Sequence, residues 1–243
     1  MASEVIVARK RACEEALKRV LELKPRIMGI GTGSTVELFV EVLSKRRENL
    51  RETAYVCSSL HTCHILSEKG FTVLHLGSTT SIDVYVDGAD EVDSELNMIK
   101  GGGAAATLEK ILAYGSKYRI YVIDYTKLVK KLGEKHAIPV EVLPEALGIV
   151  LTRLRMLGLN ISIRTLTSGK YGFVMSDTRG VIIDVKPPNW WSPRDLEKVI
   201  RSIPGVVETG LFIDLADEVF VGYPDRVEVL RKPRKNNFRA EEF

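Results

Sequence analysis

The sequence contains no glutamine, although it carries 35 lysine and arginine residues and 32 aspartate and glutamate residues among its 243 positions. Proteins from heat-adapted organisms tend to lose thermolabile amides and to gain charged residues. The absence of glutamine therefore leads us to expect a heat-adapted (thermophile) protein. A melting temperature in the range of mesophilic proteins would count against this expectation.

Cysteine is also scarce. Cys13, Cys57 and Cys63 are an odd number of cysteines and include no C-x-x-C pair, so we expect no disulfide framework. The last two lie near His61 and His64, a set that resembles the ligands of a soft metal. These residues straddle a predicted strand end and a predicted helix, however. That placement favours buried thiols and ordinary helix histidines over a metal site.

The sequence lacks a long apolar run, since no segment approaches the roughly 20 residues that span a bilayer. The polar N-terminus leads into a charged helical pattern, so we expect no signal peptide, no membrane partner and a cytoplasmic location. A formal net charge of +3 is too small to imply nucleic acid. The composition, 45% hydrophobic and 28% charged, is that of a globular protein that can form a larger and a smaller domain.

Short apolar runs alternate with helical patterns in the first half of the chain. This alternation predicts an α/β protein with a Rossmann-like, mainly parallel sheet flanked by helices. Ligands of such sheets collect at the carboxyl ends of the strands, where the turn 31–35, Asp87 and Asp124 should lie together. The expected helices are residues 5–23, 35–46, 60–69 and 104–117, and the expected strands are residues 26–30, 54–57, 71–76, 82–86 and 119–123.

Pro139 marks a change of pattern. Strands are expected at residues 140–143, 161–166, 171–175 and 181–185, with helices at 145–157 and 193–202, which together predict a smaller inserted α+β domain. Strands near 206–213 and 219–223 should return to the first sheet. We therefore expect a catalytic domain of residues 1–135 and 206–230, an inserted domain of residues 136–205 that forms a lid or oligomer contacts, and a solvated basic tail of residues 231–243.

The turn Gly31-Thr32-Gly33-Ser34-Thr35 follows a predicted strand and precedes a predicted helix. It is not a dinucleotide fingerprint, because G-x-G-x-x-G requires glycine where Ser34 stands, and it is not a Walker A loop. Its hydroxyl groups and the helix N-terminus instead suit a phosphate monoester. A helix N-cap with glycines for packing accounts for the same residues equally well.

The stretch from Asp87 to Lys110 contains an acidic turn, then Lys100 followed by the glycines 101–103, then Glu109 on a predicted helix. Backbone N–H groups approach an anion closely where no side chain intervenes, so the lysine and its glycines predict an anion site. Carboxylates on either side of such a site suit proton transfer. The stretch therefore predicts an enzyme that moves protons on a small phosphorylated substrate.

The acidic residues within this stretch also have simpler interpretations. We expect Glu91, Asp93 and Glu95 to be a solvated loop. Three aspartates at D-x-x-D-x-x-D spacing could bind a cation, but the spacing does not match the D-x-D-x-D-G calcium loop, so we expect no metal.

Six segments, in order along almost the whole chain, match one known family. They are G-I-G-T-G-S-T (29–35), Y-V-D-G-A-D-E (85–91), I-K-G-G-G-A-A (99–105), L-E-K-I (108–111), I-D-Y-T-K-L (123–128) and P-V-E-V (139–142). These segments resemble ribose-5-phosphate isomerase of the A type. The resemblance implies interconversion of ribose 5-phosphate and ribulose 5-phosphate through an enediol(ate), without a metal or an organic cofactor. It also implies a Rossmann-like domain with an inserted ferredoxin-like domain, and a homodimer or homotetramer.

Carried over residue by residue, the resemblance places the general base on Glu109, the catalytic aspartates on Asp87 and Asp90, and a site lysine on Lys100. It also aligns Lys10 with a phosphate-contacting lysine. We expect Asp87 to transfer the proton that opens the sugar ring, and Asp90 to hold Lys100 or a sugar hydroxyl. The expected substrate contacts are Thr32, Gly33, Ser34, Thr35, Gly88, Ala89, Gly101, Gly102, Gly103 and Lys127.

Two other functions remain open from the sequence. A sugar-phosphate sensor could keep the phosphate site without needing Glu109, but the chain has no residues left over for a DNA-binding unit. An acyl-transfer enzyme of similar architecture could use a glutamate as nucleophile. That alternative does not explain the hydroxyl-rich turn 31–35 or the pairing of Lys100 with Asp87.

Overall fold

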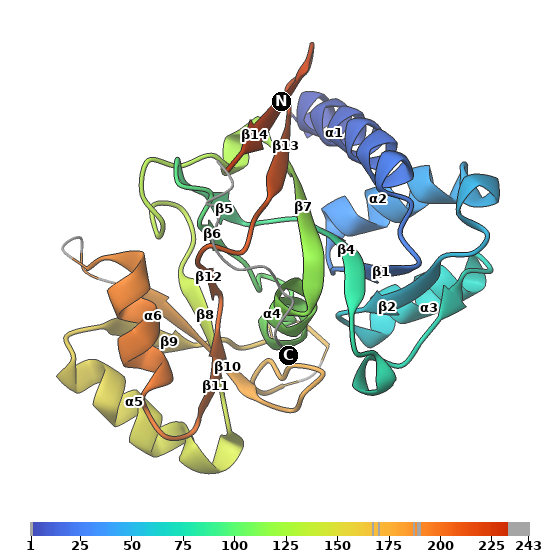
Figure 1. The fold of residues 1–243 in the computed structure, drawn as a ribbon. Coiled ribbons are helices and arrows are strands. Elements are labelled where there is room, and N and C mark those ends of the chain that lie inside the picture. Colours follow the sequence, from blue (N-terminus) through green and yellow to red (C-terminus); the bar gives the residue numbers. More distant parts are fainter. Residues whose placement is uncertain (1, 167, 170, 187, 189–190, 233–243) are drawn as a thin grey trace, which may run out of the picture.

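The computed structural model describes residues 2–232, except residues 167, 170, 187, 189 and 190, so the basic tail beyond Lys232 lies outside the described residues. The largest sheet has seven strands: β1 (Ile27–Ile30), β2 (Ala54–Cys57), β3 (Thr72–Val73), β4 (Ile82–Asp87), β7 (Ser116–Asp124), β13 (Glu218–Gly222) and β14 (Val227–Arg231). Their order is β14-β13-β7-β4-β1-β2-β3, and neighbouring strands are parallel except for the β13–β14 pair (Figure 1). The expected mainly parallel sheet is confirmed.

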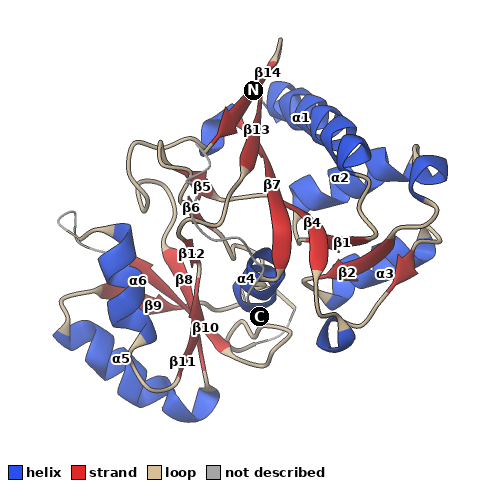
Figure 2. Ribbon diagram, in the orientation of Figure 1, coloured by secondary structure: helices blue, strands red, loops and turns tan. Residues whose placement is uncertain are grey.

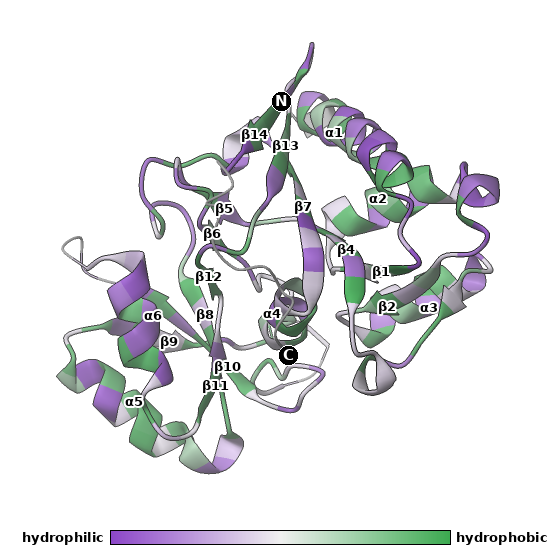
Figure 3. Ribbon diagram, in the orientation of Figure 1, coloured by the Kyte–Doolittle hydropathy of each residue, from purple (hydrophilic) through white to green (hydrophobic). Residues whose placement is uncertain are grey.

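Helices cover both faces of this sheet (Figure 2). Helices α1 (Ala2–Leu23), α2 (Ser34–Ser44) and α3 (Leu60–Glu68) bury their apolar residues in one hydrophobic cluster with the sheet. Helix α4 (Ala106–Tyr114) contributes to a second cluster, which includes the side chains of Tyr85 and Tyr121. Hydrophilic and hydrophobic bands alternate along the surface helices (Figure 3), as expected for helices with one buried face.

A second sheet has the order β11-β8-β10-β9, and its described pairs are antiparallel. It is formed by β8 (Ile138–Val142), β9 (Asn160–Ile163), β10 (Val181–Lys186) and β11 (Val206–Thr209), together with α5 (Leu147–Met156) and α6 (Pro193–Arg201). Along the chain the elements read β-α-β-β-α-β, which is the ferredoxin-like arrangement. The ferredoxin-like insertion implied by the resemblance is therefore confirmed.

The structure corrects the expectation that residues 206–213 return to the first sheet. Strand β11 pairs with β8 in the second sheet. The chain then passes Gly210, and β12 (Leu211–Phe212) joins β6 (Met98–Ile99) and β5 (Glu91–Val92) in a small third sheet. Only β13 and β14 of this region return to the first sheet.

Three further expected boundaries shift. The strand expected at 171–175 forms only isolated bridges, and the strand expected at 71–76 is reduced to β3. The helix expected at 104–117 ends at Tyr114 because β7 already begins at Ser116. Short 3-10 turns occur at η1 (Arg47–Leu50), η2 (Leu76–Ser78), η3 (Tyr125–Lys127) and η4 (Pro144–Ala146).

The structure also corrects the expectation of free thiols, because Cys57 and Cys63 form a disulfide. Cys57 ends β2, and Ser59 then caps α3 by accepting a hydrogen bond from the Thr62 N–H. This cap turns the chain back so that the two cysteine Cα atoms lie 5.6 Å apart, within the range that a disulfide bridges. The remaining cysteine, Cys13, is buried and free.

We expect reduction of this disulfide to lower the free energy of unfolding by about 2 kcal/mol, since it closes a short loop, and the melting temperature by about 4–8 °C. The measurement is thermal unfolding with and without dithiothreitol, with Cys63→Ser as the control that should not respond to the reductant. Titration of the unreduced, denatured protein should find one free thiol. Three free thiols would contradict the pairing.

Candidate active site

The turn 31–35 follows β1, and Asp87 ends the neighbouring strand β4, so both lie at the carboxyl edge of the main sheet. The order of the strands changes direction between β1 and β4. After β1 the chain adds β2 and β3 on one side of β1, and it then returns to add β4 on the other side. Ligands of open α/β sheets bind at such a switch point. Gly31 is required there, since a Cβ on it would lie 1.9 Å from the Asp87 carboxyl carbon.

The short hairpin of β5 and β6 returns the chain so that Lys100 lies beside Asp87. The Lys100 Nζ is 2.7 Å from the Asp87 Oδ2 and donates a hydrogen bond of 2.7 Å to the Gly88 carbonyl. The backbone N–H of Lys100 donates to the carbonyl of Gly210, and a Cβ on that glycine would lie 2.2 Å from the Lys100 carbonyl oxygen. Gly210 therefore permits the close backbone approach that holds this lysine.

Glu109 lies in the first turns of α4 and is only 2% exposed. Its Oε2 is 3.1 Å from the Lys100 Nζ, an ion-pair distance, but the geometry is not that of a hydrogen bond, and among the described residues this oxygen has no hydrogen-bond partner. Burial raises the pKa of Glu109 to about 8, with Lys100 opposing the shift and the negative charge of Asp87 adding to it. Glu109 is therefore a weakly solvated carboxyl group whose pKa lies near neutrality, as a general base requires.

Asp87 is 1% exposed, and both of its carboxylate oxygens are engaged. Oδ1 accepts from the Gly88 N–H, and Oδ2 accepts from the Tyr85 hydroxyl and contacts Lys100. Burial raises the pKa of Tyr85 well above its ordinary value, so the tyrosine is a neutral donor to Asp87. Burial alone would lower the pKa of Lys100, but Asp87 and Glu109 raise it above its ordinary value, so this lysine stays charged.

Of the two partners expected for Asp90, Lys100 or a sugar hydroxyl, the structure does not show the first. Its Oδ2 accepts a hydrogen bond of 2.9 Å from the Gly102 N–H, and no ion pair between Asp90 and Lys100 occurs within the described part of the chain. Gly101 has a φ of +95°, which L-residues rarely adopt. Because Gly102 is occupied by Asp90, the N–H groups of Gly101 and Gly103 remain the loop's candidates for binding an anion.

The turn 31–35 presents the N-terminus of α2, with Gly33 at a φ of +123°. The Thr32 hydroxyl was expected to contact the substrate, but it already has protein partners. Its oxygen lies 2.8 Å from the hydroxyls of both Ser58 and Ser59. Thr62 completes the hydroxyl cluster and donates to the Gly31 carbonyl. These buried hydroxyls fix the turn from behind and leave its backbone N–H groups and Ser34 at the pocket.

Two cations lie at this turn. Arg9 of α1 donates to the Asp124 Oδ2 at 2.7 Å and to the Ser34 Oγ at 3.3 Å, whereas Lys10, the residue aligned by the resemblance, is exposed to solvent. Arg9 and the buried Cys13 are four positions apart and therefore lie on the same face of α1. This spacing is the feature of the sequence that could have indicated that Arg9 faces inward. Lys127 lines the same pocket and forms no ion pair within the described residues.

These residues enclose one pocket of about 230 Å³. The expected site residues line it, with two exceptions: Asp87, which is buried in contact with Lys100, and Lys10, which is exposed to solvent. The lining residues are Arg9, Thr32, Gly33, Ser34, Thr35, Gly88, Ala89, Asp90, Lys100, Gly101, Gly102, Gly103, Glu109 and Lys127.

The expectation of a solvated loop is wrong for Glu91, which is fully buried. Its carboxylate accepts hydrogen bonds from the backbone N–H groups of Gly133, Lys135 and His136 and so holds that loop beside the hairpin. Asp93 is half-buried and accepts from N–H groups of its own turn. Both carboxylates stabilise the hairpin that carries Lys100.

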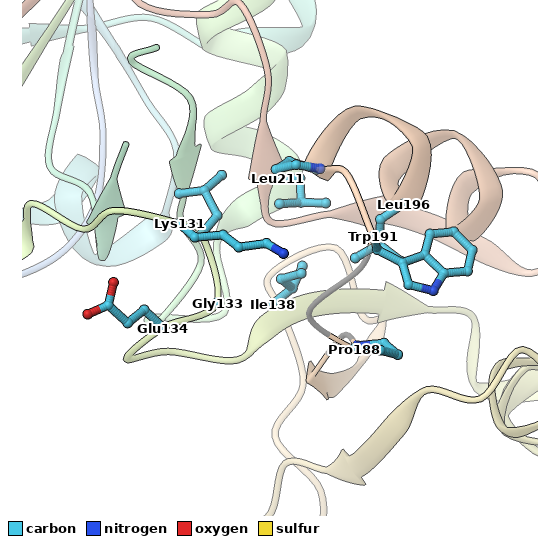
Figure 4. Close-up of a pocket in the computed structure, with 10 residues that line it drawn as sticks. Lys131, Gly133, Glu134, Ile138, Pro188, Trp191, Leu196 and Leu211 are labelled. Carbon is cyan, nitrogen blue, oxygen red and sulfur yellow. The ribbon is translucent and has the colours of Figure 1, made fainter. Parts of the chain in front are cut away.

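Other cavities lie away from this pocket. One of about 130 Å³ lies between the loop that contains Gly133 and the start of α6, and it is mostly lined by apolar side chains such as Ile138, Leu196 and Leu211 (Figure 4). Within residues 2–232, gaps excepted, no three His, Cys, Asp or Glu side chains are grouped to hold a metal ion. No helix of the described residues is long and apolar enough to cross a membrane.

The fold and the pocket define a doubly wound α/β protein with a polar, anion-accepting site at its strand switch point. A family model described as ribose 5-phosphate isomerase A (phosphoriboisomerase A) matches residues 54–226. A curated relative, ribose-5-phosphate isomerase A of Thermococcus kodakarensis, is 38% identical over 226 residues, covering 92% of this chain and 97% of the relative. The chain therefore belongs to the ribose 5-phosphate isomerase A family.

Two solved structures agree with this assignment. Ribose 5-phosphate isomerase A from Methanocaldococcus jannaschii matches with a TM-score of 0.85 and 38% identity, covering 93% of this chain and 98% of that chain. A D-ribose-5-phosphate isomerase in complex with phospho-erythronic acid matches with a TM-score of 0.88 and 37% identity, covering 94% and 99%. The relatives include proteins of thermophilic archaea, in agreement with the heat adaptation expected from the missing glutamine.

Proposed function

We propose that this protein interconverts ribose 5-phosphate and ribulose 5-phosphate. The observation that carries the proposal is the arrangement of Lys100, whose ammonium group contacts Asp87 and Glu109 at the base of a polar pocket. A buried carboxyl group of raised pKa beside a fixed positive charge can remove a carbon-bound proton and stabilise the oxyanion that results.

In the proposed reaction the Glu109 carboxylate removes the proton from C2 of the open aldose, and the electron pair forms an enediolate with its negative charge on O1. The same carboxyl group returns the proton to C1, while the proton on the C2 oxygen moves to O1, which leaves a ketone at C2 and a hydroxyl group at C1. One carboxyl group suffices, because the two carbons are neighbours. The Lys100 ammonium and the N–H groups of Gly101 and Gly103 would stabilise the charge on oxygen.

Free ribose 5-phosphate is largely cyclic, so its ring must open first. Both oxygens of Asp87 are engaged and this residue lies beneath the pocket, so we assign ring opening to the pair of Asp87 and Lys100. Lys100 is the member of the pair that reaches the sugar, and Asp87 holds its ammonium group in place. Asp90 lines the pocket, where its free oxygen suits a sugar hydroxyl.

The phosphate would bind at the turn 31–35. The α2 N-terminus, Arg9 and Lys127 place two positive charges and several N–H donors around one end of the pocket. These groups belong to α1, to the turn before α2 and to η3, whereas Glu109 belongs to α4, so the binding energy of the phosphate can fix the sugar without taking part in proton transfer. A sugar-phosphate sensor would need these phosphate-binding groups but would not need the buried carboxyl group of Glu109.

We propose that the reaction needs no metal or organic cofactor, because the Lys100 ammonium occupies the position between the carboxylates that a cation would take. We also propose a cytoplasmic homodimer or homotetramer, with residues 136–209, up to the end of β11, as an inserted domain that contributes a lid or oligomer contacts. A disulfide is compatible with the cytoplasm of a heat-adapted organism, since such organisms use intracellular disulfides.

The test is turnover of ribose 5-phosphate by purified protein. We expect ribulose 5-phosphate to form with a kcat in the ordinary enzyme range of about 1–10³ s⁻¹, unchanged by EDTA. Absence of turnover would contradict the proposed function. Loss of activity with a chelator and its recovery with a divalent ion would instead contradict only the metal-free mechanism.

The raised pKa of Glu109 predicts a pH dependence. The carboxylate is the active form of a general base, so kcat/KM should rise with pH and level off above an apparent pKa near 8. The measurement is kcat/KM for ribose 5-phosphate between pH 3.5 and 10. An acidic limb at the ordinary pKa of a glutamate, near 4.5, would contradict the proposed environment of Glu109.

A further inference from the structure

We propose that Arg164 is a positioning residue for the enediolate site, which it controls from the second sheet through the backbone of the glycine loop 101–103. This inference rests on the proposed isomerase function. Arg164 follows β9, and its sequence neighbours gave no sign that it reaches the glycine loop between β6 and α4. Its guanidinium nevertheless donates hydrogen bonds of 3.0 Å to the carbonyls of both Gly101 and Gly102.

The Arg164 guanidinium is itself held in a fixed orientation. Its Nε donates to the Asp184 Oδ2 at 2.9 Å, and a second nitrogen donates to the other oxygen of the same carboxylate. Asp184 lies in β10, paired with Ser162 of β9. The two side chains are only 20% and 22% exposed, so a bidentate pair of this kind is weakly screened by solvent and geometrically specific. One Arg164 nitrogen remains for the two glycine carbonyls.

The chemistry of the peptide group connects these contacts to the pocket. The carbonyl of Gly101 shares a peptide unit with the N–H of Gly102, and the carbonyl of Gly102 shares one with the N–H of Gly103. A positive charge at a carbonyl oxygen polarises the peptide and strengthens the donor at its other end. The Gly102 N–H binds Asp90, and Gly103 lines the pocket. Arg164 therefore fixes the loop and strengthens its donation to an oxyanion.

Arg164 and Asp90 hold the loop from opposite sides, one at its carbonyls and the other at an N–H group. Within the loop, the Ala104 N–H also donates a hydrogen bond of 3.0 Å to the Gly101 carbonyl, which leaves the Gly102 carbonyl to Arg164. Three consecutive glycines have much backbone freedom, so contacts from outside the loop are needed to fix it. Any displacement of the second sheet relative to this loop would release the Arg164 contacts. The structure thus assigns the second sheet a part in catalysis that does not require it to touch the sugar.

The test compares Arg164→Met, Arg164→Lys and Asp184→Asn with the parent, using Arg153→Met as the control on the same sheet's helix α5, where the arginine is exposed. For Arg164→Met we expect kcat to fall about 10-fold to 100-fold, somewhat less than the loss of a whole oxyanion donor, with KM within about 3-fold of the parent. The inhibition constant of phospho-erythronic acid, whose carboxylate carries negative charge in the pocket, should rise. Arg164→Lys and Asp184→Asn should lie between the parent and Arg164→Met.

Chemical rescue separates positioning from general structural damage. Millimolar guanidinium should restore part of kcat to Arg164→Ala and leave Arg153→Met unchanged. The inference is overturned if Arg164→Met keeps the parental kcat, or if kcat and melting temperature fall together and guanidinium restores nothing. An inactive parent would instead reject the proposed function, so the two failures are distinguishable.

Discussion

Replacement of Glu109 by glutamine should lower kcat for ribose 5-phosphate by about 10²–10⁴-fold, the typical contribution of a positioned general base. Glutamine has nearly the shape of glutamate but cannot accept the C2 proton. The Glu109 side chain is buried and belongs to α4, not to the turn proposed to bind the phosphate, so KM should stay within about 3-fold of the parent. The measurement is steady-state kinetics of ribose 5-phosphate isomerisation at pH 9, where Glu109 of the parent is ionised.

The control is Glu141→Gln. Glu141 is an equally buried carboxylate, 2% exposed, that accepts hydrogen bonds from Thr107 of α4 and from Ser176, but it does not line the pocket. Its replacement should affect stability and leave kcat close to the parental value. A Glu109→Gln variant that isomerises at the parental rate would show that another group is the base.

The same replacement should change the pH dependence of stability. The pKa of Glu109 is raised in the folded protein to about 8 from 4.5, so the folded state binds a proton more tightly than the unfolded state. The stabilisation from this group is complete below pH 4.5 and is lost as the pH rises through about 8. Above that pH Glu109→Gln should melt at a higher temperature than the parent. Active sites commonly carry this conflict between function and stability.

Replacement of Lys100 by methionine should damage both activity and stability. The two carboxylates that contact its ammonium group, Asp87 and Glu109, are at most 3% exposed. Removal of one partner from a buried ion pair leaves uncompensated charge and typically costs about 3–5 kcal/mol. The loss of the oxyanion's charged donor should lower kcat/KM by about 10²–10³-fold or more. Urea unfolding and steady-state kinetics measure the two effects.

The variant Lys110→Met distinguishes a loss of stability from a loss of catalysis. Lys110 lies next to Glu109 on α4, is also buried, and pairs with Glu197 and Glu208 of the second sheet's unit at 2.9 Å each. Its replacement should likewise lower the free energy of unfolding, but kcat should stay within about 3-fold of the parent below the melting temperature. Equal losses of kcat in the two lysine variants would indicate that Lys100 acts only through stability.

Much of the fold and the centre of the site could be predicted from local patterns. The alternation of apolar runs with helical segments predicted the parallel sheet, because buried strands and amphipathic helices have different periods. Asp87, Lys100 and Glu109 were found because they occur in one continuous stretch, joined by a hairpin. Residues that are close in sequence around one turn need little of the fold to come together.

The contacts that escaped prediction are long-range. Arg9 and Asp124 are 115 positions apart, and Arg164 and Gly101 are 63 apart, so only the completed fold brings each pair together. Strand β11 was assigned to the wrong sheet for the same reason. Its apolar residues show that it is buried, but the choice between two sheets depends on tertiary packing.

Glu91 and the disulfide were misjudged for local reasons. Glu91 lies among charged residues and was therefore expected to be solvated. Hydrogen bonds from the backbone N–H groups of Gly133, Lys135 and His136 instead replace the water that its carboxylate loses on burial. The cysteines at 57 and 63 have a spacing that fits no known motif. Their pairing depends on the angle between β2 and α3, which the sequence does not reveal.

The central claim is that Glu109 transfers the proton between C2 and C1 of the sugar. The most direct measurement uses ribose 5-phosphate that carries deuterium at C2 and follows the breakage of that C–D bond by NMR in the parent and in Glu109→Gln. We predict that the parent removes the label, to solvent or to C1 of the ketose, and that the variant does so about 10²–10⁴-fold more slowly. Removal of the label at the same rate in both proteins would contradict the claim.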